Sequence, residues 1–376
     1  MTLALVALIG FVGLALDVGF AWGARRRMQT AADAAATAGA VASRLGYTIT
    51  PAAKDAASLN GFTDGTSGVS VNVTSPYSGG SCSSNCVKVS IDQAQSTYFL
   101  RVLGYSSIDV KASAVAGAVN SGSCVYTLDK SASPGLKVSG NANISLSCGA
   151  IVNSTQSPGA TCSGSATFTA TSIGVAGTAS GGCFTPSPTT GVSDVANPFS
   201  SLGTTAPSCS GGSGSQNITN GQIVVLNAGS YCGGITIHNG ATVTLTPGTY
   251  NLGSGGLKVT GGTIIGTGVT FVSSSAVSFT GNPIVNLSAP TSGTYEGILF
   301  FDTDTNGSEI TGTGTSSFDG SLYFPNSNLK YSGNSSTLGY TIIAAGSLEF
   351  TGGATLGDNY SSLGGQSPIQ SSTLYE

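Results

Sequence analysis

Acidic side chains in the second half of the chain are the first candidates for catalysis, because glycan-cleaving enzymes work with a pair of carboxylates. They are spread thinly along the sequence, with no arginine beside them, and include Glu296, Asp302, Asp304, Asp319 and Glu349. The chain has a single histidine, His238, so a histidine-based catalytic or metal site has little to draw on. We therefore expect a non-enzymatic protein without a cofactor, with a polysaccharide lyase or hydrolase as the alternative.

One short segment resembles part of a calcium-binding loop. Asp302, Asp304, Asn306 and Gly307 follow the spacing of the first half of an EF-hand loop. A threonine stands where the bidentate glutamate of such a loop belongs. We keep these residues as a weak calcium candidate and favour an ordinary solvated turn.

The cysteines indicate an oxidising compartment. Their number is even, and none has the histidine support of a zinc site, so disulfides are the better interpretation. Pairing in sequence order is the simplest arrangement, although eight cysteines allow about 105 connectivities. The candidates are Cys82, Cys86, Cys124, Cys148, Cys162, Cys183, Cys209 and Cys232.

Charge is scarce. Only 7% of the residues are charged, against about 25% in ordinary soluble domains. No arginine follows Arg101, which argues against nucleic-acid binding because phosphates require clustered positive charge. Hydrophobic residues make up 40% and glycine contributes 56 residues. This composition favours ordered β structure rather than disorder.

These scattered groups have to be positioned by the rest of the chain, which begins with a long helix. An apolar run over residues 3–24 is interrupted by Asp17 and followed by Arg25, Arg26 and Arg27. About 20 helical residues cross a hydrocarbon layer, so we expect an uncleaved transmembrane anchor. The arginines alone would place the bulk of the chain in the cytoplasm. The cysteines place it outside; we give them precedence and expect a basic segment ahead of Met1.

Asp17 is the unusual residue of this helix. A carboxylate inside a membrane segment is costly and is most often functional. We expect Asp17 to pair with a partner helix, and the alternative is a residue that snorkels or is neutral. Gly10, Gly13 and Gly19 offer small surfaces for close helix packing.

Shorter elements follow the helix. We predict a transmembrane and pilin-like helix over residues 1–46, with Met28, Ala31, Ala32, Ala35, Ala38 and Val41 on one face. Gly46 and Pro51 should end it. Residues 47–118 are expected to form a small α/β module. Its predicted elements are a helix at 54–62, strands at 69–73 and 87–91, an amphipathic helix at 96–104 and a strand at 108–116.

The string LALDVGFAWGARRRMQTAADAAATAGA resembles the N-terminal segment of TadE/TadG-like Flp pilus-assembly proteins. Asp17 and Gly19 match its D-x-G step, while Gln29 and Asp33 lie in its alanine-rich part. The resemblance implies that these four residues serve assembly or helix packing. It also implies other Tad/Flp pilus proteins and membrane lipid as partners of the helix. The implied location is the bacterial inner membrane, single-pass, with the bulk in the periplasm or at the cell surface.

A repeat organises the second half. LKVSGN (136–141), LKVTGG (257–262), VSFTGN (277–282), LKYSGN (329–334) and LEFTGG (348–353) share one alternating pattern. Short strands ended by glycine, at intervals near 20 residues, favour a solenoid over a β-sandwich. We predict an all-β right-handed parallel β-helix over residues 119–370. A Pro/Ser/Gly-rich insertion is expected at about 180–220 and a tail at 371–376.

The second half also resembles a C-terminal region of some TadG-like proteins, in the segments around 248–271, 287–300 and 320–325. The β-helix would then stand in place of a von Willebrand factor A-type domain. The resulting hypothesis is a membrane-anchored structural component of a Tad/Flp-type (type IV) pilus assembly or secretion system. Its β-helix would be an exported scaffold or adhesive surface. The alternative is a tethered carbohydrate-binding or carbohydrate-active protein, in which host or surface glycans stack on Tyr295, Tyr323, Tyr331 and Tyr340.

Overall fold

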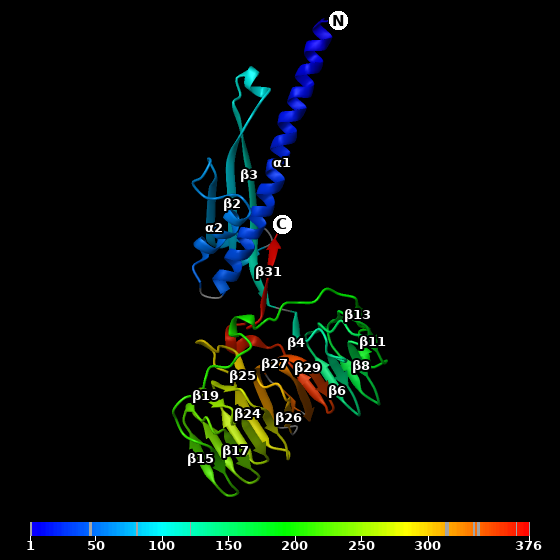
Figure 1. Ribbon diagram of the computed structural model, residues 1–376, viewed down its shortest axis with the longest axis vertical. Helices are drawn as coiled ribbons and strands as arrows, with labels where there is room; N and C mark the ends of the chain where they lie inside the picture. The colour runs from blue at the N-terminus through cyan, green and yellow to red at the C-terminus, as the bar shows by residue number, and fades with distance from the viewer. Residues whose placement is uncertain are drawn as a thin grey trace. The chain divides into compact units, whose positions relative to one another are not determined.

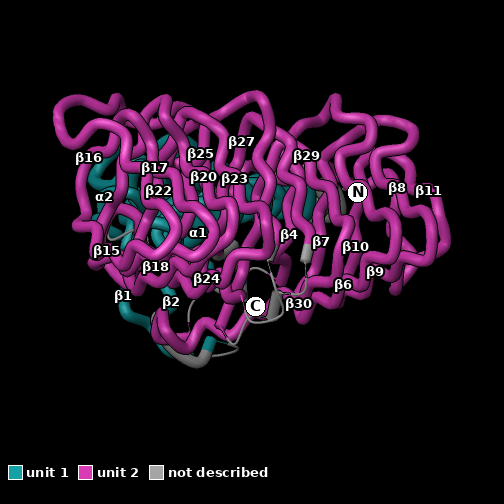
Figure 2. Tube along the Cα trace, turned by 90° about the horizontal axis from the view of Figure 1, so that it is seen from below, with its two compact units in different colours: residues 1–120, 370–376 teal, residues 121–369 magenta. Residues whose placement is uncertain are grey.

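The computed structural model describes residues 2–44, 47–79, 82–120, 122–312, 316–333, 335–336, 339–365 and 367–375. It divides into two compact units. Unit 1 comprises residues 1–120 and 370–376, and unit 2 comprises residues 121–369 (Figure 2). Each unit is described by itself.

Unit 1 is a four-stranded antiparallel sheet with two helices (Figure 1). The helices are α1 (Thr2–Arg44) and α2 (Ile49–Leu59). The sheet has the order β1-β2-β3-β31, and β2 and β3 form a long hairpin. The strands are β1 (Ser70–Gly79), β2 (Cys82–Ser96), β3 (Ser107–Asn120) and β31 (Gln370–Tyr375).

The C-terminal half of α1 packs on this sheet through small residues. Met28, Ala31, Ala32 and Ala35 are fully buried, as the helical spacing predicts. The next turn differs from the prediction: Ala38 is half-buried and Val41 is 44% exposed, and the buried positions there are Ala36, Gly39 and Ala40. A Cβ at Gly39 would lie 2.8 Å from Val87 Cγ1, so the missing side chain lets the helix approach β2 closely.

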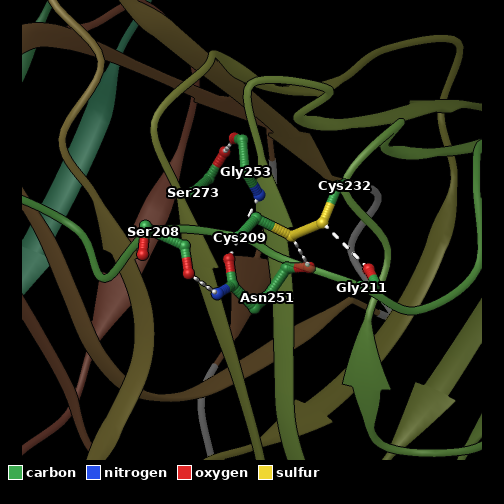
Figure 3. Close-up of a disulfide and its surroundings, with 7 residues drawn as sticks. All are labelled: Ser208, Cys209, Gly211, Cys232, Asn251, Gly253 and Ser273. Atoms are coloured by element: carbon green, nitrogen blue, oxygen red, sulfur yellow. Dashed lines mark hydrogen bonds between the residues drawn. A yellow bond between two sulfur atoms is a disulfide. The ribbon is translucent and has the colours of Figure 1, made fainter.

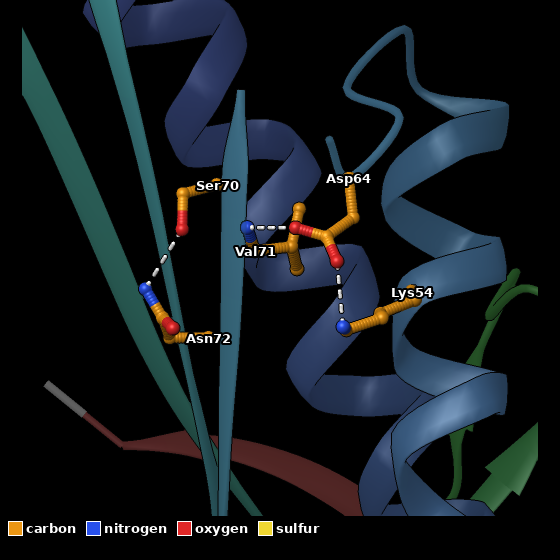
Figure 4. Close-up of polar contacts among 5 residues, drawn as sticks. All are labelled: Lys54, Asp64, Ser70, Val71 and Asn72. Carbon is orange, nitrogen blue, oxygen red and sulfur yellow. Dashed lines mark hydrogen bonds and ion pairs between the residues drawn. The ribbon is translucent and has the colours of Figure 1, made fainter. Parts of the chain in front are cut away.

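α2 begins earlier than predicted. It includes Pro51 in its first turn, where a helix tolerates the missing N–H. Asp64 holds the loop that follows: its carboxylate lies 2.6 Å from the ammonium of Lys54 and accepts a hydrogen bond from the N–H of Val71 at 2.8 Å (Figure 4). These two contacts lower the pKa of the Asp64 carboxyl. The loop thereby connects α2 to the start of β1.

The segment predicted as a tail is a strand. β31 pairs antiparallel with β3, with Asn120 opposite Gln370 and Val115 opposite Tyr375. Since β3 ends where unit 2 begins and β31 begins where unit 2 ends, the solenoid is an insertion between two neighbouring strands of unit 1. A linear reading of the sequence misses this arrangement, because β31 has only six residues and lies far from its partner along the chain.

Unit 2 is a parallel β-solenoid of about ten turns with three faces. The first face contains β4 (Ser123–Thr127), β7 (Gly149–Val152), β10 (Ile173–Val175), β13 (Thr189–Thr190), β16 (Gly229–Ser230), β19 (Gly248–Gly253), β22 (Val269–Ser273) and β25 (Ile298–Asp302). The long strand β27 (Ser317–Gly333) begins on the third face, and both β27 and β29 (Thr341–Phe350) then run along the first face onto the second.

The other strands form the remaining faces. The second face contains β5 (Leu136–Val138), β8 (Ala160–Cys162), β11 (Ala179–Ser180), β14 (Gln216–Ile218), β17 (Ile235–His238), β20 (Leu257–Thr260), β23 (Val277–Phe279) and β26 (Ser308–Gly312). The third contains β6 (Asn143–Leu146), β9 (Thr167–Thr169), β12 (Phe184–Thr185), β15 (Ile223–Leu226), β18 (Thr242–Leu245), β21 (Thr263–Gly266), β24 (Ile284–Ser288), β28 (Ser335–Ser336) and β30 (Ala354–Leu356).

The coils do not stack in sequence order. The first coil, β4 to β6, pairs on one side with β7 to β9 and on the other with β29 and β30 of the last coil (Figure 2). The chain therefore enters the solenoid in its middle and builds one arm outwards to β13. It then crosses to the far end and builds the second arm inwards from β14 to β30.

All five copies of the repeat lie on the second face. Leu136 pairs with Leu348, Leu348 with Leu329, and on the same face Leu257 pairs with Val277. These side chains are at most 1% exposed and form a ladder inside the solenoid. The glycines at Gly140 and Gly281 have φ values of 72°, which confirms the predicted positive-φ turn after the strand.

Aromatic rings fill the core behind the first face. Tyr231, Tyr250, Phe271, Phe300 and Phe324 follow one another with ring centroids 5.3–6.2 Å apart. Such contacts stabilise the stack beyond the area they bury. Successive coils of the second arm, from the one with β16 to the one with β27, thus contribute their rings to a continuous column.

A crossover segment, residues 191–215, connects the two arms. It contains one short 3₁₀-helix, η2 (Ser200–Leu202), and is shorter than the predicted insertion at 180–220, since β11 to β13 already form coils. Val195 exchanges two hydrogen bonds with the amide of Asn153, at 2.7 and 2.9 Å. The Cys209–Cys232 disulfide fixes the end of the crossover beside β19, where Asn251 Nδ2 donates to the Ser208 carbonyl (Figure 3).

Candidate functional site

The N-terminal half of α1 presents apolar side chains to the outside. Between Gly10 and Ala24 they are 43–74% exposed, although the helix has no matching polar face there. A helix on the surface of a soluble domain normally buries its apolar side. The exposed residues are Phe11, Val12, Leu14, Leu16, Val18, Phe20 and Trp22.

The tip of the β2–β3 hairpin lies beside this half of the helix (Figure 1). It comprises residues 97–106 and contains the 3₁₀-helix η1 (Leu100–Leu103). The sequence predicted a longer amphipathic helix at 96–104. The hairpin shortens it, because β2 continues to Ser96 and β3 starts at Ser107. The tip also exposes large apolar side chains: Tyr98, Phe99, Val102, Leu103 and Tyr105.

Asp17 connects the helix to the hairpin tip. Its carboxylate accepts hydrogen bonds from the backbone N–H groups of Tyr98, Phe99 and Leu100, at 2.9, 2.9 and 2.7 Å. These groups form the N-terminal turn of η1, which has no capping side chain of its own. Asp17 is only 3% exposed. The carboxylate of α1 therefore caps η1 from outside the hairpin.

Close packing accompanies these hydrogen bonds. A Cβ at Gly13 would lie 2.5 Å from the ring of Phe99, so only glycine leaves room for that ring. One turn beyond Asp17, the Phe20 ring packs on Tyr98 with centroids 5.8 Å apart. Gly13, Asp17 and Phe20 thus form one contact line for the tip.

The sequence analysis did not identify the tip as part of a site. The signal that could have identified it was a run of apolar residues on both sides of Arg101, between two strands.

The other residues predicted for assembly have different positions. Gln29 donates to the Asp33 carboxylate at 2.9 Å and to the Ser113 carbonyl at 3.0 Å, which fastens α1 to β3. Gly19 faces open space, since a Cβ there would meet no atom of the chain within 4 Å. Asp17, Gln29 and Asp33 are thus engaged within unit 1, and Gly19 is free to approach another molecule. Pairing of Asp17 with a partner helix stays a prediction.

Basic residues follow the apolar N-terminal half of α1. Arg25, Arg26 and Arg27 are exposed on three successive positions of α1 and begin three residues after Trp22. Residues 1–42 match the family "Putative Flp pilus-assembly TadE/G-like". This TadE/G-like segment covers almost all of α1 and supports a role related to the Tad/Flp pilus. No curated protein and no solved structure is detectably similar to the chain.

The TadE/G-like segment also bears on the predicted transmembrane helix. Within the residues that the structure describes, no helix is both long and apolar enough to span a membrane. The family connects the segment with membrane-associated pilus proteins.

The calcium candidates in unit 2 form hydrogen bonds with one another and with neighbouring residues of the solenoid. Asp302 accepts hydrogen bonds from the N–H of Asp304 at 3.0 Å and from Ser308 Oγ at 2.7 Å, and it is fully buried. Burial raises the pKa of its carboxyl to about 6. Asp304 in turn accepts two hydrogen bonds from Asn306. Among the described residues, no group of three or more His, Cys, Asp or Glu side chains is placed to hold a metal.

The tyrosines do not support a glycan-stacking surface. Tyr323, Tyr331 and Tyr340 are at most 2% exposed, so the expectation that they stack on sugars is wrong. Tyr331 occupies an inward position of β27, where its ring packs on Phe318 and Phe350. Tyr323 points to the opposite side of β27, where Phe199 and Asn197 of the crossover cover it. Tyr340 lies just before β29 and packs on Tyr360. Tyr295 is half-buried and packs on Phe301.

Two further carboxylates proposed for catalysis are also occupied. Asp319 accepts a hydrogen bond from the N–H of Tyr340 at 2.8 Å, and Glu349 forms an ion pair with Lys137. A polar pocket of about 350 Å³ lies near Asn326 and Ser327, and its one carboxylate, Asp129, accepts two hydrogen bonds from Ser131. This pocket lacks the second carboxylate that a glycosidase uses.

The disulfides follow sequence order. They join Cys82 to Cys86 in unit 1, and Cys124 to Cys148, Cys162 to Cys183 and Cys209 to Cys232 in unit 2. In the first arm, coils that follow one another in the sequence stack directly, which brings Cys124 to Cys148 and Cys162 to Cys183.

Proposed function

We propose that the protein is a membrane-anchored structural component of a Tad/Flp-type pilus assembly or secretion system. The TadE/G-like segment anchors it in the bacterial inner membrane and contacts other pilus proteins. The solenoid is a non-enzymatic scaffold or adhesive surface in the periplasm or at the cell surface. The family match over α1, together with the exposed apolar half of that helix, carries the proposal.

The surface of α1 supports anchoring. Seven large apolar side chains between Phe11 and Trp22 are exposed, and they are followed by Arg25–Arg27. Apolar surface removed from water contributes roughly 25 cal/mol per Å². Basic residues beside an apolar segment favour the phosphate level of a membrane. Gly19 is an open position at which a second helix can approach.

The construction of the solenoid supports a scaffold role. Its aromatic column and its leucine ladder point inwards. Of the five carboxylates considered for catalysis, four are buried, hydrogen-bonded or paired, and Glu296 is exposed. Disulfides stabilise such an exported domain where thiols are oxidised. The four pairs in the chain fit that compartment.

Co-purification of the full-length protein tests the proposal. A tagged chain is captured from its own cells in mild detergent, and Flp pilin and Tad machinery proteins are sought by mass spectrometry. Gly19→Leu, which fills an open position on α1, should reduce the recovery of these proteins. Leu59→Ser, at an exposed residue at the end of α2, is the matched control and should leave recovery unchanged.

Two results would contradict the proposal. Assembly complexes purified through a pilus subunit should contain this chain, and its consistent absence would count against a structural role. Cleavage of neutral or acidic glycans by the full-length protein would instead favour the enzymatic alternative. A null result with those glycans is expected.

A further inference from the structure

We infer that the tip of the β2–β3 hairpin is a second membrane-contacting element, which enters the lipid beside α1 with its backbone capped by Asp17. This inference rests on the proposed anchoring of α1. The tip is residues 97–106, and the ligand is the acyl and phosphate region of a bilayer.

Contact with α1 determines the depth of the tip. It is held at Gly13 and Asp17, which lie 12 and 8 residues before Arg25. At 1.5 Å per residue, the tip lies roughly 12–18 Å along the helix from the first arginine. With Arg25 at the phosphates, that distance reaches the hydrocarbon layer, whose half-thickness is about 15 Å. A tip bound to these residues enters the lipid whenever α1 does.

Backbone N–H groups of the tip have hydrogen-bond acceptors, as a lipid environment requires. Unpaired N–H groups are costly in lipid because no water is present to bond them. Asp17 accepts from the N–H groups of Tyr98, Phe99 and Leu100, which η1 itself leaves unbonded. The N–H groups of Val102, Gly104 and Tyr105 bond to carbonyls within the tip at 3.1 Å.

The exposed side chains fit lipid better than a single protein partner. With about 100° per residue, the exposed apolar positions of α1 from Phe11 to Trp22 extend over roughly two thirds of the helix circumference. Gly13 and Asp17 occupy the remaining side, which faces the tip. A packed protein helix covers a stripe of about 100°, whereas lipid surrounds an inserted element.

The polar groups of the tip can extend from this depth towards the phosphates. Tyr98 and Tyr105 are amphipathic rings of the kind found at membrane interfaces. Arg101 is exposed, and its guanidinium can extend towards the anionic phosphates while its stem stays in the apolar layer. Val102 and Leu103, 86% and 73% exposed, are the most exposed apolar side chains of the tip.

Tryptophan fluorescence tests the inference on the full chain. Trp22 is the only tryptophan, so Trp22→Phe gives a silent background. Leu103→Trp then places a reporter on the tip, and Leu59→Trp places the control at an 89% exposed site on α2. Each variant is mixed with phosphatidylcholine–phosphatidylglycerol vesicles that carry brominated acyl chains. We expect a blue shift and quenching for the Leu103→Trp reporter and neither for the Leu59→Trp reporter.

A binding measurement complements the spectra. Val102→Ser together with Leu103→Ser should lower partition into the same vesicles about tenfold or more, since two large apolar side chains lose their favourable transfer from water into lipid. Leu59→Ser with Tyr47→Ser, at two exposed residues outside the tip and the apolar half of α1, should leave partition unchanged. Far-UV circular dichroism verifies that the variants fold.

The outcomes separate the two proposals. Quenching of Trp22 in the native chain without quenching of the Leu103→Trp reporter overturns the lipid-contacting tip and leaves anchoring intact. Quenching at neither position contradicts anchoring itself, and the tip falls with it. A blue shift of the Leu103→Trp reporter that occurs only in isolated pilus complexes, without quenching by brominated lipid, assigns the tip to a protein partner and overturns the inference.

Discussion

The ammonium of Lys137 lies 2.9 Å from the carboxylate of Glu349, and this ion pair joins the first coil of the solenoid to the last. The pair belongs to a ladder of outward residues on the second face. Glu349 is followed by Lys330, which forms a second 2.9 Å pair with Glu309. The hydrogen bond with Glu309, aided by Glu349, raises the pKa of the Lys330 ammonium. Charges of alternating sign therefore favour this alignment of the two arms.

Removing Lys137 and Glu349 singly and together should reveal their coupling. In a double-mutant cycle of Lys137→Met and Glu349→Gln, we expect an interaction free energy of about 0.5–1 kcal/mol, because both side chains are partly exposed. Urea unfolding followed by far-UV circular dichroism measures it. Lys258→Met is the control, since Lys258 pairs with Ser278 on the same face and has no acidic neighbour in register there. A coupling of zero would remove the ion pair from the forces that join the arms.

Asp17→Ala should loosen the hairpin tip. The substitution leaves the N–H groups of Tyr98, Phe99 and Leu100 without their acceptor. We expect about tenfold or faster amide exchange at these positions, because hydrogen bonds to a charged group are stronger than neutral ones. Asp17→Asn, which keeps one acceptor oxygen, should have an intermediate effect. Unchanged exchange at all three amides would contradict the capping role.

Loss of the Cys209–Cys232 disulfide should destabilise the outer end of the second arm. The bond closes a loop between residues separated by 23 positions, and the chain-entropy model assigns such a loop about 3 kcal/mol. Cys209→Ser with Cys232→Ser should therefore lower the urea midpoint of the solenoid and expose the crossover to proteases. Cys82→Ser with Cys86→Ser, in unit 1, should leave that transition in place. Equal midpoints for both double variants would show that the crossover is held by other contacts.

Protonation of Asp302 should raise the unfolding free energy of the solenoid as the pH falls. Its carboxyl pKa is raised from 3.8 to about 6 because it is buried, so the folded state takes up a proton before the unfolded state does. The destabilisation from the ionised form is complete above about pH 6 and disappears below about pH 4. The full difference is roughly 3 kcal/mol at about 1.4 kcal/mol per pKa unit.

Asp302→Asn cannot ionise and serves as the reference. The difference in unfolding free energy between wild type and Asp302→Asn, measured from pH 7.5 to pH 4, should change in favour of the wild type as the pH falls. Using this difference cancels contributions from other groups such as Asp64 and Asp194, whose pKa values are lowered. A difference independent of pH would show that Asp302 titrates normally.

The long helix, the strands of unit 1 and the parallel solenoid were predictable, because each depends on a local pattern. The repeats identified one face of the solenoid correctly: Leu136, Leu257 and Leu348 all lie on it. They could not give the order of the coils. Every copy provides the same inward and outward positions, so a parallel strand finds a similar partner on either side. Only contacts between particular coils, such as Lys137 with Glu349, distinguish the neighbours.

The partner of Asp17 was unpredictable for a related reason. Its spacing within an apolar helix indicates a carboxylate with a special role, and the same residues fit a partner helix or an element of the same chain. The amides of Tyr98, Phe99 and Leu100 that bind it belong to backbone, which leaves no mark in the sequence. In contrast, Gly13 is a marker that can be interpreted afterwards, because only a glycine admits the ring of Phe99.

The insertion of the solenoid between β3 and β31 has an evolutionary consequence. The sheet of unit 1 is completed by Asn120 and Gln370 lying opposite each other, so the inserted domain needs only two ends that lie close together. Domains with adjacent ends are tolerated at such sites. Recombination can therefore exchange the domain carried between β3 and β31 as one block. The helix and sheet that receive it would be inherited unchanged while the cargo diversifies.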